Sequence, residues 1–460
     1  MIFSSIEYFV FFTILYSLYW ILPGTLAKHI LLLVGSLVFY ASWSKLFLLH
    51  FLFAILVNYA FLRKFERAPS KKWLVLAIVL NLCNLGFFKY FYFFTEILEP
   101  ITGFHAKTDL GFRVFLPLAI SFYTFQMIAY VVDVYSGKIQ EKTSLFDFAI
   151  FILFFPQLIA GPIMRHNDFF SEYRNPQFKV DYMYSGISLI LLGIVKKILI
   201  ADNISFIIDP VFSNPKLYSG ETLALAVFGF SFQVFADFSG YTDLARGSAY
   251  LLGFSIPQNF RSPYLASSPS DLWRRWHITL STWLRDYIYI PLGGNKGSEL
   301  RVGFNQILTF TLGGLWHGAN WTFILWGFFH GVMLTIDRQY RRFSLPLPKN
   351  DTVRLLIGIV ISYLIFAFGA LLFRSNSLEE VFYVLTHLGS RGITLEKGAV
   401  ELLLNVMVAA YLIQVAEYFP SFSEALKKYR PVLLPIAAIL ILIICSHYSR
   451  EGQEFIYFDF

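Results

Sequence analysis

Apolar segments long enough to cross a lipid bilayer recur along almost the whole chain. They lie at residues 4–22, 27–62, 73–95, 112–134, 183–208, 221–255, 303–337, 353–373, 400–419 and 431–448, with a shorter run near 378–388. A membrane-spanning helix needs about 20 mostly apolar residues, so the run at 27–62, interrupted at 42–45, predicts two helices. The pattern therefore predicts an all-α, polytopic membrane protein with about 11 or 12 membrane helices.

One apolar run, at residues 146–164, contains two prolines. Pro156 and Pro162 lie close together in it, and a proline inside a helix removes one backbone hydrogen bond and clashes with the preceding turn. Such breaks at membrane depth are tolerated where they line a cavity or lie within protein. This run therefore predicts a broken or re-entrant element.

Residues 268–290 have a different pattern. Ser268 followed by Pro269 and Asp271 is typical of a helix start. Apolar side chains then follow at steps of three and four, at Trp273, Trp276, Leu280, Trp283 and Tyr287, and predict one apolar stripe. Because Arg274, Arg275 and Arg285 make the segment too charged to span, it is expected to lie in the membrane interface or line the mouth of a cavity.

Composition supports the membrane class and excludes others. Of the 460 residues, 57% are hydrophobic and 15% are charged, whereas soluble domains carry roughly 25% charged residues. The net charge of +7 is explained by Lys and Arg in cytoplasmic loops, above all the basic cluster at 63–72. We see no basic domain that could bind nucleic acid. Two isolated cysteines and the absence of a His-Glu-x-x-His motif argue against a disulfide framework and a metal site.

His317 is the strongest candidate for chemistry, because an ionisable side chain at membrane depth is a functional hypothesis by default. On a continuous helix, Gly313 and Gly314 would lie one turn before it, and Asn320 and Trp321 one turn after it. Asn320 could then orient the imidazole and Trp321 could shield it. The alternative, a histidine hydrogen-bonded within the helix bundle, is left open by these residues alone. His330, further along the same apolar run, is expected to be structural.

Three other ionisable residues are candidates for this site. His277 lies well before His317 in the chain, on the amphipathic segment, and an imidazole suits proton removal from a hydroxyl or thiol. Asp237 and Asp243 lie inside an apolar run, where they are costly unless paired or facing water. Asp243 could form an ion pair with Arg246, or these carboxylates could line a pocket, and both interpretations are open. Acyl transfer fits this inventory, and on composition alone a transporter fits nearly as well.

Several longer motifs resemble one known family. They are FPQLIAGP at 155–162, DFSGY at 237–241, NFRSPY at 259–264, WRRWHITLS at 273–281 followed by Asp286-Tyr287, and LWHG at 315–318. In this order they resemble the membrane-bound O-acyltransferase (MBOAT) family over most of the chain. The most similar subgroup is that of the bacterial proteins of alginate and peptidoglycan O-acetylation, with the teichoic acid D-alanylation protein a more distant relative.

The resemblance implies a fold and a reaction. It implies a single membrane domain at 1–460, built around a transmembrane tunnel in the bacterial cytoplasmic (inner) membrane, with membrane lipid around it. His317 matches the catalytic histidine and His277 the second characteristic histidine, near the cytoplasmic mouth. The implied donor is acetyl-CoA, and the implied partner is an extracytoplasmic polysaccharide O-acetyltransferase. We assign Arg274, Arg275 and Arg285 to the CoA phosphates, and count Trp316, Asn320, Trp321 and Asp237 among the substrate- and donor-binding residues.

The C-terminal residues 455–460 carry a further hypothesis. The sequence Phe455-Ile456-Tyr457 resembles a short tail found in such proteins or on a small companion. A phenol can accept an acyl group when a base removes its proton, so Tyr457 is a candidate acyl carrier. An aromatic anchor at the membrane interface is the alternative. For the whole chain, a lipid-directed acyltransferase and a transporter or flippase without covalent chemistry remain alternatives, and both alginate-like exopolymer and peptidoglycan are open as acceptors.

Overall fold

The computed structural model describes residues 1–159, 161–343, 350–419, 421 and 427–448. Within these ranges the regular structure is helical, apart from an isolated β-bridge between Tyr218 and Ile393. The predicted all-α class is therefore confirmed. The chain forms two compact units, one of residues 1–186 with 245–257 and one of residues 187–244 with 258–460. The helices α10 (Val180–Ile194) and α12 (Gly220–Leu251) contribute residues to both.

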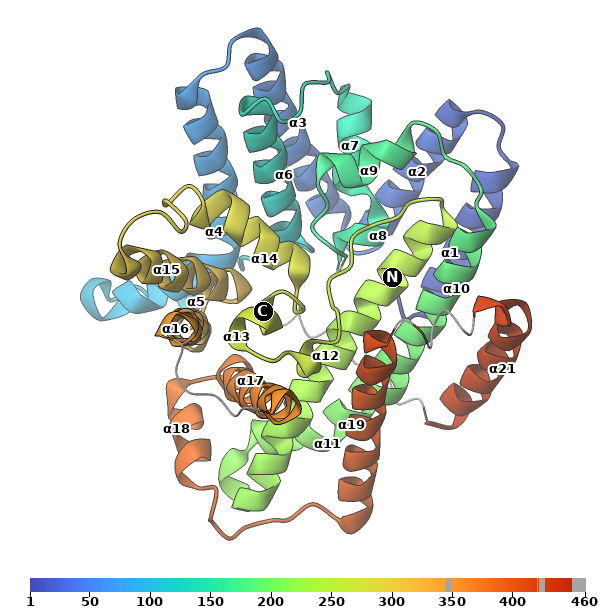
Figure 1. Ribbon diagram of the computed structural model, residues 1–460. Coiled ribbons are helices and arrows are strands. Elements are labelled where there is room, and N and C mark those ends of the chain that lie inside the picture. The colour runs from blue at the N-terminus through green and yellow to red at the C-terminus, as the bar shows by residue number, and fades with distance from the viewer. Residues whose placement is uncertain (160, 344–349, 420, 422–426, 449–460) are drawn as a thin grey trace. The chain divides into compact units, whose positions relative to one another are not determined.

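The first unit is built from the N-terminal helices, coloured blue to blue-green in Figure 1. They are α1 (Ile6–Ile21), α2 (Thr25–Ala41), α3 (Lys45–Arg67), α4 (Lys71–Thr102), α5 (Ala106–Asp109), α6 (Ile120–Tyr135), α7 (Leu145–Leu153), α8 (Phe155–Leu158) and α9 (His166–Tyr173). The predicted break within 27–62 is confirmed, because Ser44 accepts a hydrogen bond from the backbone N–H of Phe47 and so begins α3.

The broken element predicted around Pro156 is also confirmed. The helix α7 ends at Leu153 and the single turn α8 begins at Phe155, with Pro156 in its first turn. The amide of Gln157 donates to the carbonyl oxygen of Phe151 at 2.6 Å, and that of Gln126 to the same oxygen at 3.2 Å. These side chains satisfy a backbone acceptor that the break would otherwise leave exposed to an apolar interior.

The second unit contains the candidate site. Its helices are α11 (Asp202–Ser213), α13 (Pro269–Trp273), α14 (Ile278–Leu284), α15 (Glu299–His317), α16 (Trp321–Phe343), α17 (Asp351–Arg374), α18 (Leu378–Thr386), α19 (Lys397–Tyr418) and α21 (Arg430–Tyr448). Short π-helical turns at Val195–Ala201 and Arg285–Tyr289, and 3-10 turns at Pro215–Leu217 and Pro263–Leu265, connect them.

The run at 303–337 is two helices and not the one span that the apolar pattern predicts. Gly318 is extended, at φ −163°, and ends α15 directly after His317. A Cβ atom at Gly318 would lie 2.1 Å from the ring of Phe323, so a larger residue does not fit this turn. The side-chain oxygen of Asn320 accepts from the backbone N–H of Thr322 and caps α16. The chain therefore reverses where a continuous helix was expected.

The resulting hairpin of α15 and α16 is very closely packed. Cβ atoms at Gly314 and Gly327 would each lie 2.2 Å from a backbone carbonyl oxygen of the opposite helix, those of Phe323 and Phe310 respectively. Gly331 is similarly close to the backbone of Ile307. Small residues let helix backbones approach in this way in membrane proteins. This contact fixes the end of α15, and with it His317.

Seven helical segments within the described residues are long and apolar enough to cross a membrane. They are Lys45–Arg67, Lys71–Thr102, Val180–Ser213, Gly220–Leu251, Asp351–Arg374, Lys397–Tyr418 and Arg430–Tyr448, with shorter apolar helices at Ile6–Ile21 and Thr25–Ala41. The protein is thus a multi-pass membrane protein. The count is lower than the predicted 11 or 12 because α6 and α7 have only 16 and 9 residues, and because α15 and α16 carry many polar side chains.

Buried ion pairs join the π-helical turn at Val195–Ala201 to α12. The ammonium of Lys197 lies 2.8 Å from carboxylate oxygens of both Asp202 and Asp237. The ammonium of Lys196 lies 2.8 Å from Asp243 and from Glu417 on α19. Carboxylates at membrane depth are costly unless paired, and these pairs supply the missing partners. Asp237, counted above among the donor-binding residues, is therefore placed in a structural ion pair.

This arrangement predicts that Lys197→Met destabilises the protein. The change would leave the buried carboxylates of Asp202 and Asp237 without that cation, and breaking a buried pair in this way costs about 3–5 kcal/mol. Thermal unfolding in detergent should show a clearly lowered midpoint, and adding Asp202→Asn and Asp237→Asn should restore most of it. The exposed Lys216→Met is the control. An unchanged midpoint for Lys197→Met would show that the pair is not structural.

Candidate active site

His317, the last residue of α15, is buried in an aromatic environment. Its side chain is 4% exposed. Its ring lies 4.9 Å from that of Trp316, 4.9 Å from that of Trp326 on α16, and 5.2 Å from that of Phe373 on α17, measured between ring centroids. Trp326 and Phe373 were not among the predicted site residues, because the turn after His317 and the packing of α17 bring them to the imidazole. The site around the imidazole is therefore largely free of bulk water.

His277 lies between two helices and not within one. Its φ of +40° is left-handed and ends the helical segment predicted over 268–290, which the structure divides into α13 and α14. The expected start at Ser268 and Pro269 is confirmed, but the continuous stripe is wrong after Trp273. Asn259 holds the break open, because its backbone carbonyl accepts from Ile278 N–H at 3.0 Å and its side-chain oxygen accepts from Thr279.

The His277 imidazole is buried and neutral. It is 1% exposed, and within the described residues neither ring nitrogen has a hydrogen-bond partner. Burial lowers the pKa of His277 to about 3, because the charged form loses its hydration. A neutral imidazole offers one N–H donor and one nitrogen acceptor. Most buried polar groups are hydrogen-bonded, so the two unsatisfied nitrogens of His277 are an exception, although Nε2 of His330 also lacks a partner among the described residues.

Trp316 connects the two histidines. Its ring lies 4.9 Å from that of His317 and 6.3 Å from that of His277. The His277 ring also lies 4.7 Å from that of Phe238 on α12. The structure therefore brings two imidazoles that are far apart in the sequence near the same indole.

Other predicted residues lie elsewhere. The side-chain amide of Asn320 donates to the backbone carbonyl of Asn376 at 2.8 Å, and its oxygen caps α16, so Asn320 fixes the turn after His317. Trp321 is 54% exposed, and Trp326 occupies the place beside His317 that was expected for Trp321. His330, expected to be structural, is buried between the rings of Trp273 and Trp326 at 5.1 and 4.9 Å.

The three arginines assigned to the donor do not gather in one place. Arg275 pairs with Asp271 at 2.9 Å and lies over the Tyr418 ring. Arg285 pairs with Asp286 at 2.8 Å and its side chain is 59% exposed. Arg274 lines a large pocket whose lining does not include the other two. The split follows from the break at His277, which turns Arg285 onto another helix.

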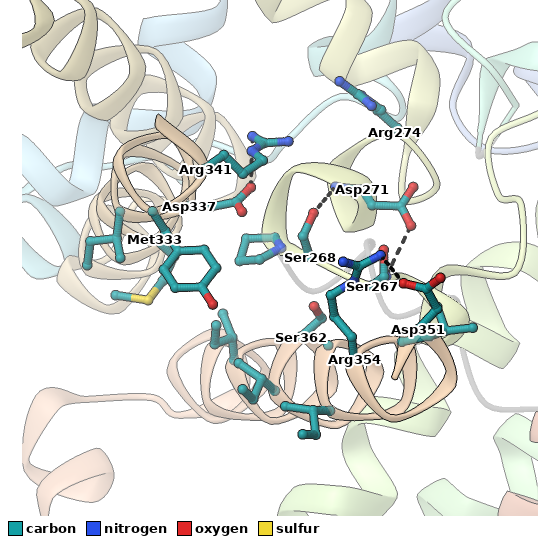
Figure 2. Close-up of a pocket in the computed structure, with 18 residues that line it drawn as sticks. Ser267, Ser268, Asp271, Arg274, Met333, Asp337, Arg341, Asp351, Arg354 and Ser362 are labelled. Atoms are coloured by element: carbon teal, nitrogen blue, oxygen red, sulfur yellow. Dashed lines mark hydrogen bonds and ion pairs between the residues drawn. The ribbon is translucent and has the colours of Figure 1, made fainter. Parts of the chain in front are cut away.

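The pocket at Arg274 has a volume of about 780 Å³ and lies between α13, α16 and α17 (Figure 2). One part of its wall is apolar, formed by Met333, Ile336, Leu355, Ile357, Ile361 and Ile365. Figure 2 shows Arg274, Arg341 and Arg354 around the charged part. Arg341 is paired with Asp337 at 3.0 Å and Arg354 with Asp351 at 2.6 Å. Such a cavity suits a ligand with both anionic and apolar parts.

A buried hydroxyl also faces this pocket. Ser362 on α17 lines it and is 2% exposed, and its oxygen has no hydrogen-bond partner within the described residues. Over the same part of the chain, no three His, Cys, Asp or Glu side chains gather in a way that would hold a metal ion. The polar groups at the two histidines and in the pocket are imidazoles, guanidinium groups, carboxylates and hydroxyls.

Comparison with known proteins agrees with this inventory. Residues 138–378 match the membrane-bound O-acyltransferase family. A probable alginate O-acetylase of Pseudomonas aeruginosa is 40% identical over 82% of this chain and 73% of its own. One of Azotobacter vinelandii is 38% identical over 89% and 85%. The peptidoglycan O-acetyltransferase of Helicobacter pylori is 37% identical over 79% and 74%.

The family match includes both histidines and the whole of the break between α15 and α16, so the resemblance seen in the motifs is confirmed. The chain is an acyltransferase of the membrane, and it belongs to the membrane-bound O-acyltransferase family.

Proposed function

We propose that this protein takes an acetyl group from cytoplasmic acetyl-CoA and passes it across the bacterial inner membrane for O-acetylation of a cell-envelope polysaccharide. The observation that carries the proposal is the pair of buried histidines whose rings both lie near that of Trp316. Relatives named as alginate O-acetylases and a peptidoglycan O-acetyltransferase support an envelope polysaccharide as the final acceptor. An extracytoplasmic polysaccharide O-acetyltransferase is the partner that would complete the transfer.

His317 is the general base in this proposal. Its imidazole takes the proton from an acceptor hydroxyl, whose oxygen attacks the thioester carbonyl. The carbon–oxygen bond forms, the carbon–sulfur bond breaks, and the leaving thiolate receives the proton back from the imidazolium. The rings of Trp326 and Phe373 beside His317 exclude water that would otherwise hydrolyse the thioester.

His277 stabilises the reacting carbonyl in this proposal. Because its pKa is lowered to about 3, the ring is neutral at physiological pH and can direct one N–H toward the developing oxyanion. A donor in a buried site acts strongly on such a charge, since no water competes and no reorganisation is needed. Trp316 holds this ring and that of His317 at their separation.

The pocket at Arg274 is the proposed donor site. Coenzyme A carries phosphates, which arginine binds well, and a less polar arm that suits the apolar wall. The helix α17 lines this pocket with Ser362 and reaches His317 with Phe373, about 16 Å further along its axis. A donor lying along α17 would direct its thioester toward His317. Arg341 and Arg354, which line the same pocket, join Arg274 as phosphate contacts, and Arg275 and Arg285, which do not line it, contribute less.

Tyr457 is the proposed acyl carrier. It lies outside the described residues, so the proposal rests on the chemistry of a phenol near the chain end. A phenol deprotonated by His317 can receive the acetyl group and present it as an ester to the partner transferase. An aromatic anchor in the interface is the competing role.

The base assignment predicts that His317→Ala lowers acetyl transfer by at least about 100-fold, the lower range of what a general base contributes. The measurement is transfer of radiolabel from acetyl-CoA by membranes that contain equal amounts of each protein. The exposed His447→Ala is the matched control. A transporter predicts no transfer by the wild type, and a lipid-directed enzyme predicts label in lipid. An active His317→Ala would contradict the assignment.

The donor assignment predicts that Arg274→Ala raises KM for acetyl-CoA roughly tenfold, the effect of losing about 1.4 kcal/mol of binding, with kcat little changed. Arg285→Ala should raise KM less. Steady-state rates with acetyl-CoA and with acetyl-dephospho-CoA separate a phosphate contact from a general loss of stability. Arg391→Ala, in an exposed loop, is the control. Equal KM values for Arg274→Ala and wild type would place the donor elsewhere.

The carrier assignment predicts acetylated Tyr457 in protein incubated with acetyl-CoA, detected by mass spectrometry of C-terminal peptides. Tyr457→Phe should abolish delivery to the extracytoplasmic acceptor, because a phenyl ring has no hydroxyl to acylate. Tyr448→Phe, at an exposed tyrosine on α21, is the matched control and should be active. Full activity of Tyr457→Phe would leave only the anchoring role.

A further inference from the structure

A much smaller cavity shares the wall residues Trp326 and Phe373 with the surroundings of His317. Its volume is about 20 Å³. Seven apolar side chains line it, all of them buried: Phe230 and Val234 of α12, Trp276, Trp326 of α16, and Phe366, Ala370 and Phe373 of α17. We call it the methyl cavity.

Two lining residues contact His317, and a third is the chain neighbour of His277. The rings of Trp326 and Phe373 lie 4.9 and 5.2 Å from that of His317. Trp276 directly precedes His277 and lies 4.6 Å from the ring of Phe366 across the cavity wall. Two lining residues of the methyl cavity therefore contact the imidazole of His317, and a third adjoins His277 in the chain.

The volume sets what the cavity can hold. A water molecule requires roughly 10–15 Å³ measured in the same way, so a space of about 20 Å³ accepts about one group of that size. A methyl group meets this limit and a longer alkyl chain exceeds it. Five of the seven lining side chains are aromatic, and their rings pack at 4.6 Å between Trp276 and Phe366 and at 5.6 Å between Trp326 and Phe373. Close-packed interiors of this kind do not expand without strain.

We propose that the methyl cavity receives the methyl group of the acetyl donor and restricts the enzyme to acetyl transfer. The proposal rests on the proposed function, since it concerns the acyl group that His317 transfers. Val234 and Ala370, the two smallest lining residues, are specificity-determining. The other five are bulky rings that define the walls.

The reaction with a longer acyl group should be slow for a simple reason. Rejection of one additional methylene by an apolar pocket corresponds to about 10–200-fold in kcat/KM. Wild-type protein should therefore prefer acetyl-CoA over propionyl-CoA by about that factor, and over butyryl-CoA by more. The carbonyl chemistry is the same for all three donors, so the difference reports on the space around the alkyl part.

The test changes the cavity in both directions. Val234→Ala removes two methyl groups from the wall and should raise the propionyl-to-acetyl ratio of kcat/KM at least about tenfold. Ala370→Val adds two methyl groups and should lower acetyl transfer itself. Val302→Ala is the matched control, because Val302 is fully buried on α15 but lies about 22 Å along that helix from His317. Full-length protein in lipid nanodiscs is used, with size-exclusion profiles to compare folding.

The outcomes separate this inference from the proposed function. A raised propionyl-to-acetyl ratio for Val234→Ala, with the wild-type ratio for Val302→Ala, supports the methyl cavity. Acetyl transfer by wild type with an unchanged ratio for Val234→Ala overturns the cavity assignment alone. Equal use of acetyl-CoA and propionyl-CoA by wild type also overturns it. No acetyl transfer by wild type overturns both.

Discussion

The close packing of α15 on α16 is the constraint on which the candidate site depends. At Gly314 and Gly327 the backbones approach so closely that a single added Cβ would meet a carbonyl oxygen. This contact is possible only because the chain reverses at Gly318, immediately after His317. The reversal returns Trp326 to the imidazole. A side chain at a helix end, held by a tight turn, is better fixed than one on a free loop, as the proposed role of His317 requires.

The buried lysines of the second unit are paired with carboxylates, whereas the buried imidazole of His277 lacks hydrogen-bond partners among the described residues. The buried cations Lys196 and Lys197 each have two carboxylate partners at 2.8 Å, as expected where an unpaired charge is expensive. The His277 imidazole is equally buried, but its nitrogens have no partner among the described residues. Its left-handed backbone adds local strain. His277 thus combines a left-handed backbone with an unsatisfied side chain, and such departures from local rules are expected at functional positions.

The sequence predicted those features that depend on local chemistry. The helix start at Ser268, the break at Pro156 and the apolar spans follow from capping, proline geometry and composition, and the structure has them. The breaks at Gly318 and His277 were not predicted. The ring of Phe323 packs against the first, and Asn259, well upstream in the sequence, supports the second through hydrogen bonds. The same limit applies to Arg341 and Arg354, whose sequence positions gave no sign that they share a pocket with Arg274.

One face of the helix α17 lines both cavities of the second unit and contacts His317. Gly358 packs so closely on Ser267 that a Cβ would lie 2.4 Å from its carbonyl oxygen, which fixes the helix against the segment that begins α13. One turn later Ser362 faces the large pocket, then Phe366 and Ala370 line the methyl cavity, and Phe373 contacts His317. These residues recur at steps of three and four, so they share one helical face. In the proposed function, this one face would bind the donor at one end and its acyl group at the other, with the distance between them set by the helix.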